Sequence, residues 1–234
     1  MIKVASYNIR KAIGTDRRRN PERIIDVLNE LDADIVALQE ADRRFGIRHA
    51  VLPDWLLQTH SSYRAVALPN RLESMGWHGN ALLVRRDQGA NGEVVHLPCL
   101  EPRGAVSTAL DVKGVRLRVL GMHLDLSGLW RRRQAAAVLH QIDLWQGHDP
   151  AGATILMGDL NEWSAGRGCL ADFARHYAIA PCGRSYHARR PVAALDRIMW
   201  RGALALRDCG VHMTPLSRHA SDHLPIWARF DVAS

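Results

Sequence analysis

Short apolar runs recur along the chain and are separated by polar loops. Residues 2–7 form the first run and residues 35–39 the second, and both have the length of a buried strand. Between them, Asn20-Pro21 supplies an N-cap followed by a proline at the first helical position. Apolar side chains then recur at helical spacing, so an amphipathic helix is expected over residues 20–31.

The middle and the end of the chain are rich in further strand-like runs. The expected strands cover residues 80–84, 93–97, 106–112, 115–123, 153–158, 195–200, 207–213 and 224–231. Lys113-Gly114 separates two of these runs and predicts a tight hairpin turn. Residues 131–145 contain strong helix formers and an apolar stripe, and they predict a second amphipathic helix.

Strands interrupted by helices predict an α/β fold in which two stacked sheets are covered by helices on the outside. We therefore expect a four-layer α/β/β/α sandwich with two packed mixed sheets. The sequence shows no repeat, low-complexity tract or long linker. A single domain over residues 1–234 is the simplest interpretation.

The charge of the chain favours an anionic partner. Lys and Arg total 31 against 24 Asp and Glu, which gives a net charge of +7. Only Lys3, Lys11 and Lys113 are lysines, and the planar arginine side chain matches phosphate oxygens bidentately. A polyanionic substrate fits this balance, and so does a genome that prefers arginine to lysine.

The cysteines and the hydropathy of the chain indicate a cytoplasmic protein. Cys99, Cys169, Cys182 and Cys209 form no CxxC pair, which favours reduced thiols. The amino-terminal apolar run is too short for a signal peptide, and no apolar stretch reaches 18 residues. No transmembrane segment and no obligate protein partner are expected.

Polar residues with catalytic potential stand at the ends of the apolar runs. They are Asn8, Glu40, His123, Asp159, Asn161, Asp196, Asp222 and His223. Each alone is compatible with a turn, a helix cap or a solvated loop, because Gly, Asp and Asn are common turn formers. A strand end, however, fixes the backbone while leaving the side chain accessible, which suits a functional site.

Together these motifs resemble the endonuclease/exonuclease/phosphatase superfamily, which includes deoxyribonucleases, exonuclease III-like enzymes, inositol polyphosphate phosphatases and neutral sphingomyelinases. The resemblance rests on Asn8 in SYNIR, Glu40 in LQE, and the motifs GDLN and SDHLP, and it extends from Ser6 to Phe230. It implies a metal-dependent phosphoric ester hydrolase of the phosphodiesterase or nuclease type.

The resemblance also implies a role for each residue. Hydrolysis of a phosphodiester requires a cation, a positioned water, a proton acceptor and stabilisation of developing charge. Glu40 is a hard oxygen donor suited to Mg²⁺ or Mn²⁺. The family pattern implies that Asn8 and Asp222 lie near this metal, that Asp159 and Asn161 act on the attacking water, and that His123 and His223 contact the phosphate. Asp196 is expected to pair with His223.

Substrate contacts are expected from neighbouring arginines and one tryptophan. Arg44 follows Glu40, and Arg131 and Arg133 follow His123 at the start of the second helix, where free amides also favour anions. The alternative for each arginine is a solvated position. Trp163 is expected at the rim of the site, where it serves base stacking, packing or lipid contact.

Three functions remain open at this point. The basic charge favours a phosphodiesterase acting on nucleic acid, DNA or RNA. The second is a phosphodiesterase or phosphatase acting on a phospholipid or a small phosphorylated metabolite. The third is a catalytically inactive phosphate-binding module, and the complete set of site residues argues against it.

Overall fold

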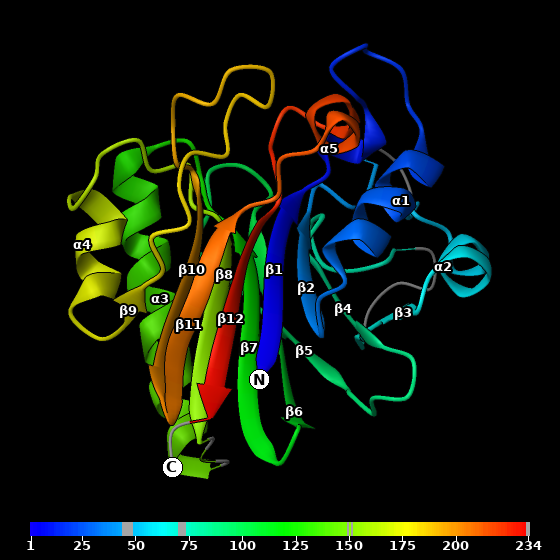
Figure 1. Ribbon diagram of the computed structural model, residues 1–234. Helices are drawn as coiled ribbons and strands as arrows, with labels where there is room; N and C mark the ends of the chain where they lie inside the picture. Colours follow the sequence, from blue (N-terminus) through cyan, green and yellow to red (C-terminus); the bar gives the residue numbers. More distant parts are fainter. Residues whose placement is uncertain (44–48, 70–73, 149, 151, 233–234) are drawn as a thin grey trace.

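Two stacked sheets form the middle of the molecule in the computed structural model, which describes residues 1–43, 49–69, 74–148, 150 and 152–232 (Figure 1). Across these residues, the first sheet has the order β11 (Leu204–Val211), β12 (Ile226–Val232), β1 (Ile2–Asn8), β2 (Ile35–Gln39), β4 (Ala81–Arg85) and β3 (Tyr63–Ala65). The second has the order β5 (Gly92–Val95), β6 (Gly104–Val112), β7 (Val115–His123), β8 (Ala153–Asp159), β10 (Asp196–Gly202) and β9 (Ala178–Ile179).

Helices cover the outer face of each sheet. The first sheet carries α1 (Pro21–Leu31), α2 (Asp54–His60) and α5 (Pro215–Ala220), and the second carries α3 (Gly128–His148) and α4 (Gly168–Ala174) (Figure 1). A short 3₁₀ turn, η1 (Arg10–Ala12), follows β1. The predicted four-layer α/β/β/α sandwich with two mixed sheets is confirmed.

Side chains of the central strands are buried on both faces. In β1, Ile2 and Val4 join the core between the two sheets, whereas Ala5 and Tyr7 pack toward the helices that cover the first sheet. Strands buried on both faces read as continuous apolar runs. This is why the sequence identified them without a polar alternation.

Most predicted elements agree with the structure to within a few residues. The strands at residues 35–39 and 115–123 match β2 and β7, and Asn20 caps α1 by accepting a hydrogen bond from the Arg23 amide. The predicted helix at residues 131–145 is too short, because α3 spans Gly128–His148. The short helices α2 and α5 were not predicted.

Parallel pairing brings the candidate site residues to one edge of the sandwich. The pairs β1–β2 and β7–β8 are parallel, so the two strands of each pair end on the same side of their sheet. A hydrogen bond from Asn8 at the end of β1 to Asp159 at the end of β8 brings the two pairs of ends together. β10 and β12 are antiparallel to β8 and β1, and their starting ends therefore lie at that side too. Every strand-end motif of the sequence meets there.

Gly158 sits where β8 approaches β7 too closely for any larger residue. A Cβ added at Gly158 would lie 1.9 Å from the Met122 carbonyl oxygen, and the backbone φ is +153°. We expect Gly158→Ala to lower the free energy of unfolding by about 3 kcal/mol. Gly89→Ala is the control, because no atom lies within 4 Å of its added Cβ. Equal urea midpoints for the two variants would contradict this interpretation.

The cysteines carry free thiols. Burial raises the pKa of Cys169 to about 12, which leaves this thiol unreactive near neutral pH. None of the helices within the described ranges combines the length and apolarity needed to cross a bilayer. The cytoplasmic location stays a prediction.

Candidate active site

Asp159 lies at the centre of the strand-end residues. Its Oδ2 atom is 3.0 Å from Asn8 Nδ2, which donates a hydrogen bond to it. The same oxygen is 3.4 Å from His123 Nε2 and 3.7 Å from His223 Nε2. Its other oxygen, Oδ1, accepts a hydrogen bond of 2.9 Å from the Asn161 backbone amide. One buried carboxylate thus gathers four of the predicted residues.

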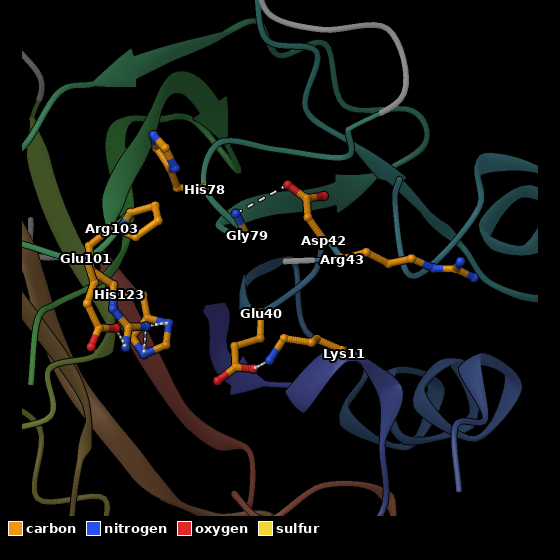
Figure 2. Close-up of a pocket in the computed structure, with 10 residues that line it drawn as sticks. Lys11, Glu40, Asp42, Arg43, His78, Gly79, Glu101, Arg103 and His123 are labelled. Carbon is orange, nitrogen blue, oxygen red and sulfur yellow. Dashed lines mark hydrogen bonds and ion pairs between the residues drawn. The ribbon is translucent and has the colours of Figure 1, made fainter. Parts of the chain in front are cut away.

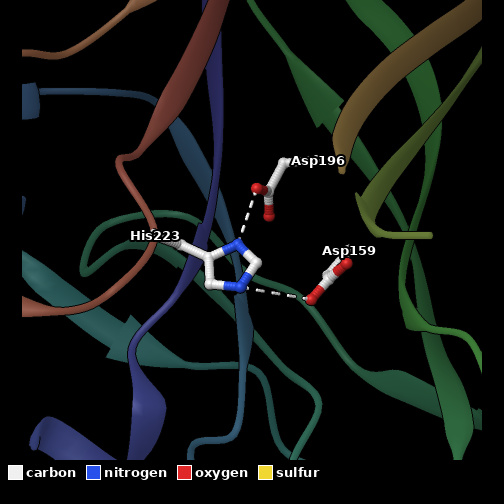
Figure 3. Close-up of side chains that lie close together, drawn as sticks. All are labelled: Asp159, Asp196 and His223. Atoms are coloured by element: carbon white, nitrogen blue, oxygen red, sulfur yellow. Dashed lines mark hydrogen bonds and ion pairs between the residues drawn. The ribbon is translucent and has the colours of Figure 1, made fainter. Parts of the chain in front are cut away.

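His223 is held by a second carboxylate, as predicted. Its Nδ1 lies 2.8 Å from Asp196 Oδ2, and its Nε2 points toward Asp159 (Figure 3). Ser185 also donates to Asp196 Oδ2. Burial by itself lowers the pKa of His223, but Asp196 and Asp159 together outweigh burial and raise this pKa to about 10. His223 is therefore cationic at neutral pH.

His123 has the opposite protonation state. Burial lowers its pKa to about 4; Asp159 favours the charged form, while nearby Arg103 opposes it. Arg103 Nη1 lies 2.7 Å from His123 Nε2 and 2.9 Å from Nδ1. The site therefore holds one charged and one neutral imidazole, each with its Nε2 near Asp159 Oδ2.

Glu40 faces a cavity beside this cluster. The cavity is also lined by Lys11, His78, Arg103 and His123 (Figure 2). Burial opposes ionisation of Glu40, but the pKa of this carboxyl is lowered, with the cationic side chains of Lys11 and Arg103 favouring its charged form. Lys11 Nζ pairs directly with Glu40 Oε2. Glu40 is thus an ionised carboxylate open to the cavity.

The cluster of Asp159, Asp196 and His223 and the separate carboxylate of Glu40 are two places whose chemistry suits a divalent cation. Among the described residues, Asp159, Asp196 and His223 offer ligand atoms within 4.8 Å of one another. His223 Nδ1 and Asp196 Oδ2 are, however, committed to each other at 2.8 Å. Glu40 fits better, because Mg²⁺ typically binds one or two carboxylates and completes its shell with water and substrate phosphate.

Asp222 and Asn161 have contacts that refine their predicted roles. Asp222 Oδ2 lies 3.2 Å from Arg10 Nε, so this carboxylate already has a cationic partner. Asn161 Nδ2 donates to the Leu124 carbonyl oxygen at 3.0 Å. Asn161 has a φ of +49°, which turns the chain directly after β8. A metal contact of Asp222 and a water contact of Asn161 stay predictions.

The predicted substrate residues are dispersed. Arg44 lies outside the described residues. Arg131 is buried and bonds to Glu162 at 3.3 Å, so its guanidinium supports the neighbouring loop. Arg133 is exposed over the Trp130 ring. Trp163 is exposed and lies edge-on to Tyr186 with ring centroids 6.0 Å apart. Substrate contacts of these residues stay predictions.

At least four described residues of the site were not singled out from the sequence. Lys11 and Arg103 line the cavity at Glu40, Ser185 bonds to Asp196, and Tyr186 packs on His223 with centroids 4.9 Å apart. Lys11 follows the SYNIR motif by one residue and is the only one of the four with a usable signal in the sequence. The others lie between the named elements, at least 11 residues along the chain from their partners.

The sequence matches one protein-family model over most of its length. The model described as "Endonuclease/Exonuclease/phosphatase family" matches residues 5–223. No curated protein matches the chain.

Solved structures share the fold across nearly the whole chain. A mannosyl-6-phosphatase from Bacteroides thetaiotaomicron is 17% identical, with a TM-score of 0.76 over 99% of this chain and 100% of that one. The human Nocturnin catalytic domain with bound sulfate anion is 21% identical, with a TM-score of 0.74 over 99% and 94%. Truncated TDP2 from Caenorhabditis elegans is 17% identical, with a TM-score of 0.73 over 98% and 97%.

Proposed function

The chain belongs to the endonuclease/exonuclease/phosphatase family, and on that premise we propose that it hydrolyses a phosphodiester with the help of a divalent cation. The observation that carries the proposal is the Asp159 carboxylate, whose Oδ2 faces Asn8, His123 and His223. A buried carboxylate between a cationic and a neutral imidazole is suited to acid–base chemistry on a phosphate.

Asp159 accepts the proton of the attacking water. Asn8 donates to its Oδ2 and the Asn161 amide to its Oδ1, so the carboxylate is fixed in one orientation. A fixed base raises the rate because little reorganisation is needed in the transition state. Asn8 is itself held, since its Oδ1 accepts from the Arg10 amide at 3.1 Å.

His223 stabilises the charge that develops on the phosphoryl oxygens. Its Nδ1–H is directed at Asp196, which leaves Nε2–H to donate toward the substrate beside Asp159. Neutral His123, in contact with Arg103, offers a second polar group on the other side. Asp196 fixes the orientation of His223 and favours its cationic form.

Glu40 is the residue that we assign to the cation, Mg²⁺ or Mn²⁺. When bound, such an ion neutralises phosphate charge and polarises the phosphoryl group. Lys11 pairs with this carboxylate. Asn8 and Asp222 are the nearest further candidates by sequence pattern, each with an amide or carboxylate oxygen.

Two structural neighbours support chemistry on a phosphate-like anion. One is named a phosphatase, and another was solved with bound sulfate, which is tetrahedral like phosphate. The net charge of +7 favours a nucleic acid or another polyanion as substrate. The phosphatase neighbour keeps a phosphomonoester, such as a sugar phosphate, as the second candidate.

A substrate panel tests the proposed function. Metal-stripped protein is assayed with added Mg²⁺ or Mn²⁺ on bis(p-nitrophenyl) phosphate, p-nitrophenyl phosphate, plasmid DNA, single-stranded RNA and phospholipid vesicles. The proposal expects cleavage of the diester and of one natural substrate. Cleavage of the monoester alone would support the phosphatase, and no cleavage with either metal would support a binding module.

Glu40→Gln tests the assignment of the cation. Removing the only carboxylate that we assign to it is expected to raise the Mg²⁺ concentration for half-maximal rate at least about tenfold. Isothermal titration with Mg²⁺ provides a readout that does not depend on turnover. Exposed Glu22→Gln on α1 is the control and keeps wild-type Mg²⁺ affinity. Unchanged Mg²⁺ binding in Glu40→Gln would place the cation elsewhere.

A further inference from the structure

Three segments beside the candidate active site, two of which run into the helices α3 and α4, display large apolar side chains to solvent. These rim segments are residues 97–103, 124–133 and 162–168, which adjoin Arg103, His123 and Asn161 respectively. Leu100 is 71% exposed, Leu126 60%, Leu129 61% and Trp163 64%. Exposed apolar residues that gather beside a functional site typically mark a contact surface.

Buried polar residues hold the rim segments together. Asp125 accepts hydrogen bonds from the Leu100 amide at 3.3 Å and the Ser127 amide at 2.9 Å, which joins the first segment to the second. Arg131 donates to the Leu126 carbonyl oxygen at 2.6 Å and to Glu162 at 3.3 Å, which joins the second to the third. The exposed leucines therefore stand on a fixed platform.

The charge exposed on the rim segments has one sign. Their exposed residues are Pro98, Cys99, Leu100, Pro102, Leu126, Gly128, Leu129, Arg132, Arg133, Trp163, Ser164, Ala165, Gly166 and Arg167. The acidic residues Asp125 and Glu162 are buried, and half-buried Glu101 pairs with Arg103 at 3.2 Å. The surface thus presents aliphatic groups and arginines. Its one partly exposed carboxylate, Glu101, is paired with Arg103, and Arg132 is paired with Asp172 outside the rim segments.

We propose that the rim segments dock on the surface of an anionic phospholipid bilayer, and that the phosphodiester cleaved by this site belongs to a membrane phospholipid. The proposal rests on the proposed function of the site. Leu100, Leu126 and Leu129 insert at the boundary between headgroups and acyl chains, while Arg133 and Arg167 attract anionic headgroups. The segments bring the residues around Asp159 to the level of the headgroup phosphate.

The chemistry of the exposed side chains favours a lipid over a nucleic acid. Binding to single strands uses aromatic rings on which bases stack. Three of the four large apolar side chains exposed on the rim segments are leucines, which have no π-face. Among these four, only Trp163 is suited to base stacking. Transfer of a leucine side chain from water to hydrocarbon, by contrast, is favourable.

Vesicle co-sedimentation tests the docking surface. Vesicles of phosphatidylcholine with three parts in ten of phosphatidylglycerol are compared with pure phosphatidylcholine vesicles. Wild-type protein is expected to sediment with the mixed vesicles, and added salt is expected to weaken binding. The double variant Leu126→Ser/Leu129→Ser is expected to lower the partition coefficient at least about tenfold.

A leucine elsewhere on α3 provides the matched control. Leu144 is 47% exposed and lies about 22 Å along the helix from Leu129, at 1.5 Å rise per residue. Leu144→Ser is expected to bind vesicles like the wild type. Leu144→Ser and the double variant should both keep the wild-type melting temperature. Both should also hydrolyse soluble bis(p-nitrophenyl) phosphate at the wild-type rate, because these leucines are outside the catalytic cluster.

The outcomes separate this proposal from the proposed function. Wild-type protein that stays in the supernatant, or a double variant that sediments equally well, would overturn the docking surface. Oligonucleotide binding that is lost in Trp163→Ala, without vesicle binding, would replace the lipid by a single-stranded nucleic acid. Vesicle binding without cleavage of any phosphodiester would keep the surface and overturn the proposed function.

Discussion

Replacing Asp159 by Asn is expected to lower kcat for phosphodiester hydrolysis by about three orders of magnitude, the upper part of the range for general-base catalysis. Asparagine has nearly the same shape, but its single amide oxygen can accept from only one of Asn8 and the Asn161 amide. It also cannot take a proton from water. KM should change little, because the loss falls on the transition state. Steady-state kinetics on bis(p-nitrophenyl) phosphate measures both constants.

The matched control for Asp159 is Asp87→Asn. Asp87 is exposed in the turn after β4, so its charge is lost without any contact to the site. Circular dichroism and thermal melts establish that both variants fold. If Asp159→Asn kept more than a tenth of the wild-type kcat, Asp159 would not be the base.

His223→Ala is expected to lower kcat by about two to three orders of magnitude, since the loss of one preorganised donor to a developing oxyanion typically lowers kcat by that factor. The change removes a cation that Asp159 and Asp196 both face, so two buried carboxylates lose their partner. His223→Gln retains a hydrogen-bond donor and is expected to recover part of the rate.

The control for His223 is His140→Ala, on the exposed face of α3. It is expected to keep wild-type kcat and stability. Partial recovery in His223→Gln distinguishes a donor role from simple structural support, because both variants remove the cation. Equal loss in the two variants, with equally lowered melting temperatures, would assign His223 a structural role instead.

Much of this arrangement was accessible from the sequence, for a physical reason. Runs such as residues 35–39 and 153–158 are buried on both faces, so their apolar length alone marks them as strands. Polar residues directly after such runs sit at a strand end, and parallel pairing gathers those ends at one edge. The cluster around Asp159 follows from these two facts.

Residues that reach the site from loops were not accessible in the same way. Arg103 touches His123 because β6 pairs with β7 and Gly104 lies opposite His123. Tyr186 reaches His223 through a single bridge between two irregular segments. No local pattern predicts such contacts, since they depend on where a loop is placed after the sheets have formed.

The surface around the site shows the same limit. The sequence indicated a basic protein and favoured nucleic acid on that ground. The sequence does not show which side chains are exposed. Leu126 and Leu129 could equally be buried core leucines until the structure shows that both are exposed to solvent. The combination of exposed leucines and arginines is the basis of our proposal that a lipid surface is the source of the phosphate.

Hydrolysis of bis(p-nitrophenyl) phosphate in ¹⁸O-labelled water, with Mg²⁺ added to metal-stripped protein, tests the central claim most directly. The account predicts that wild-type protein releases p-nitrophenol and that the p-nitrophenyl phosphate produced carries one ¹⁸O atom from water. It also predicts that Asp159→Asn forms this product about a thousandfold more slowly. Absence of labelled product from the wild type, or equal rates in the two proteins, would contradict it.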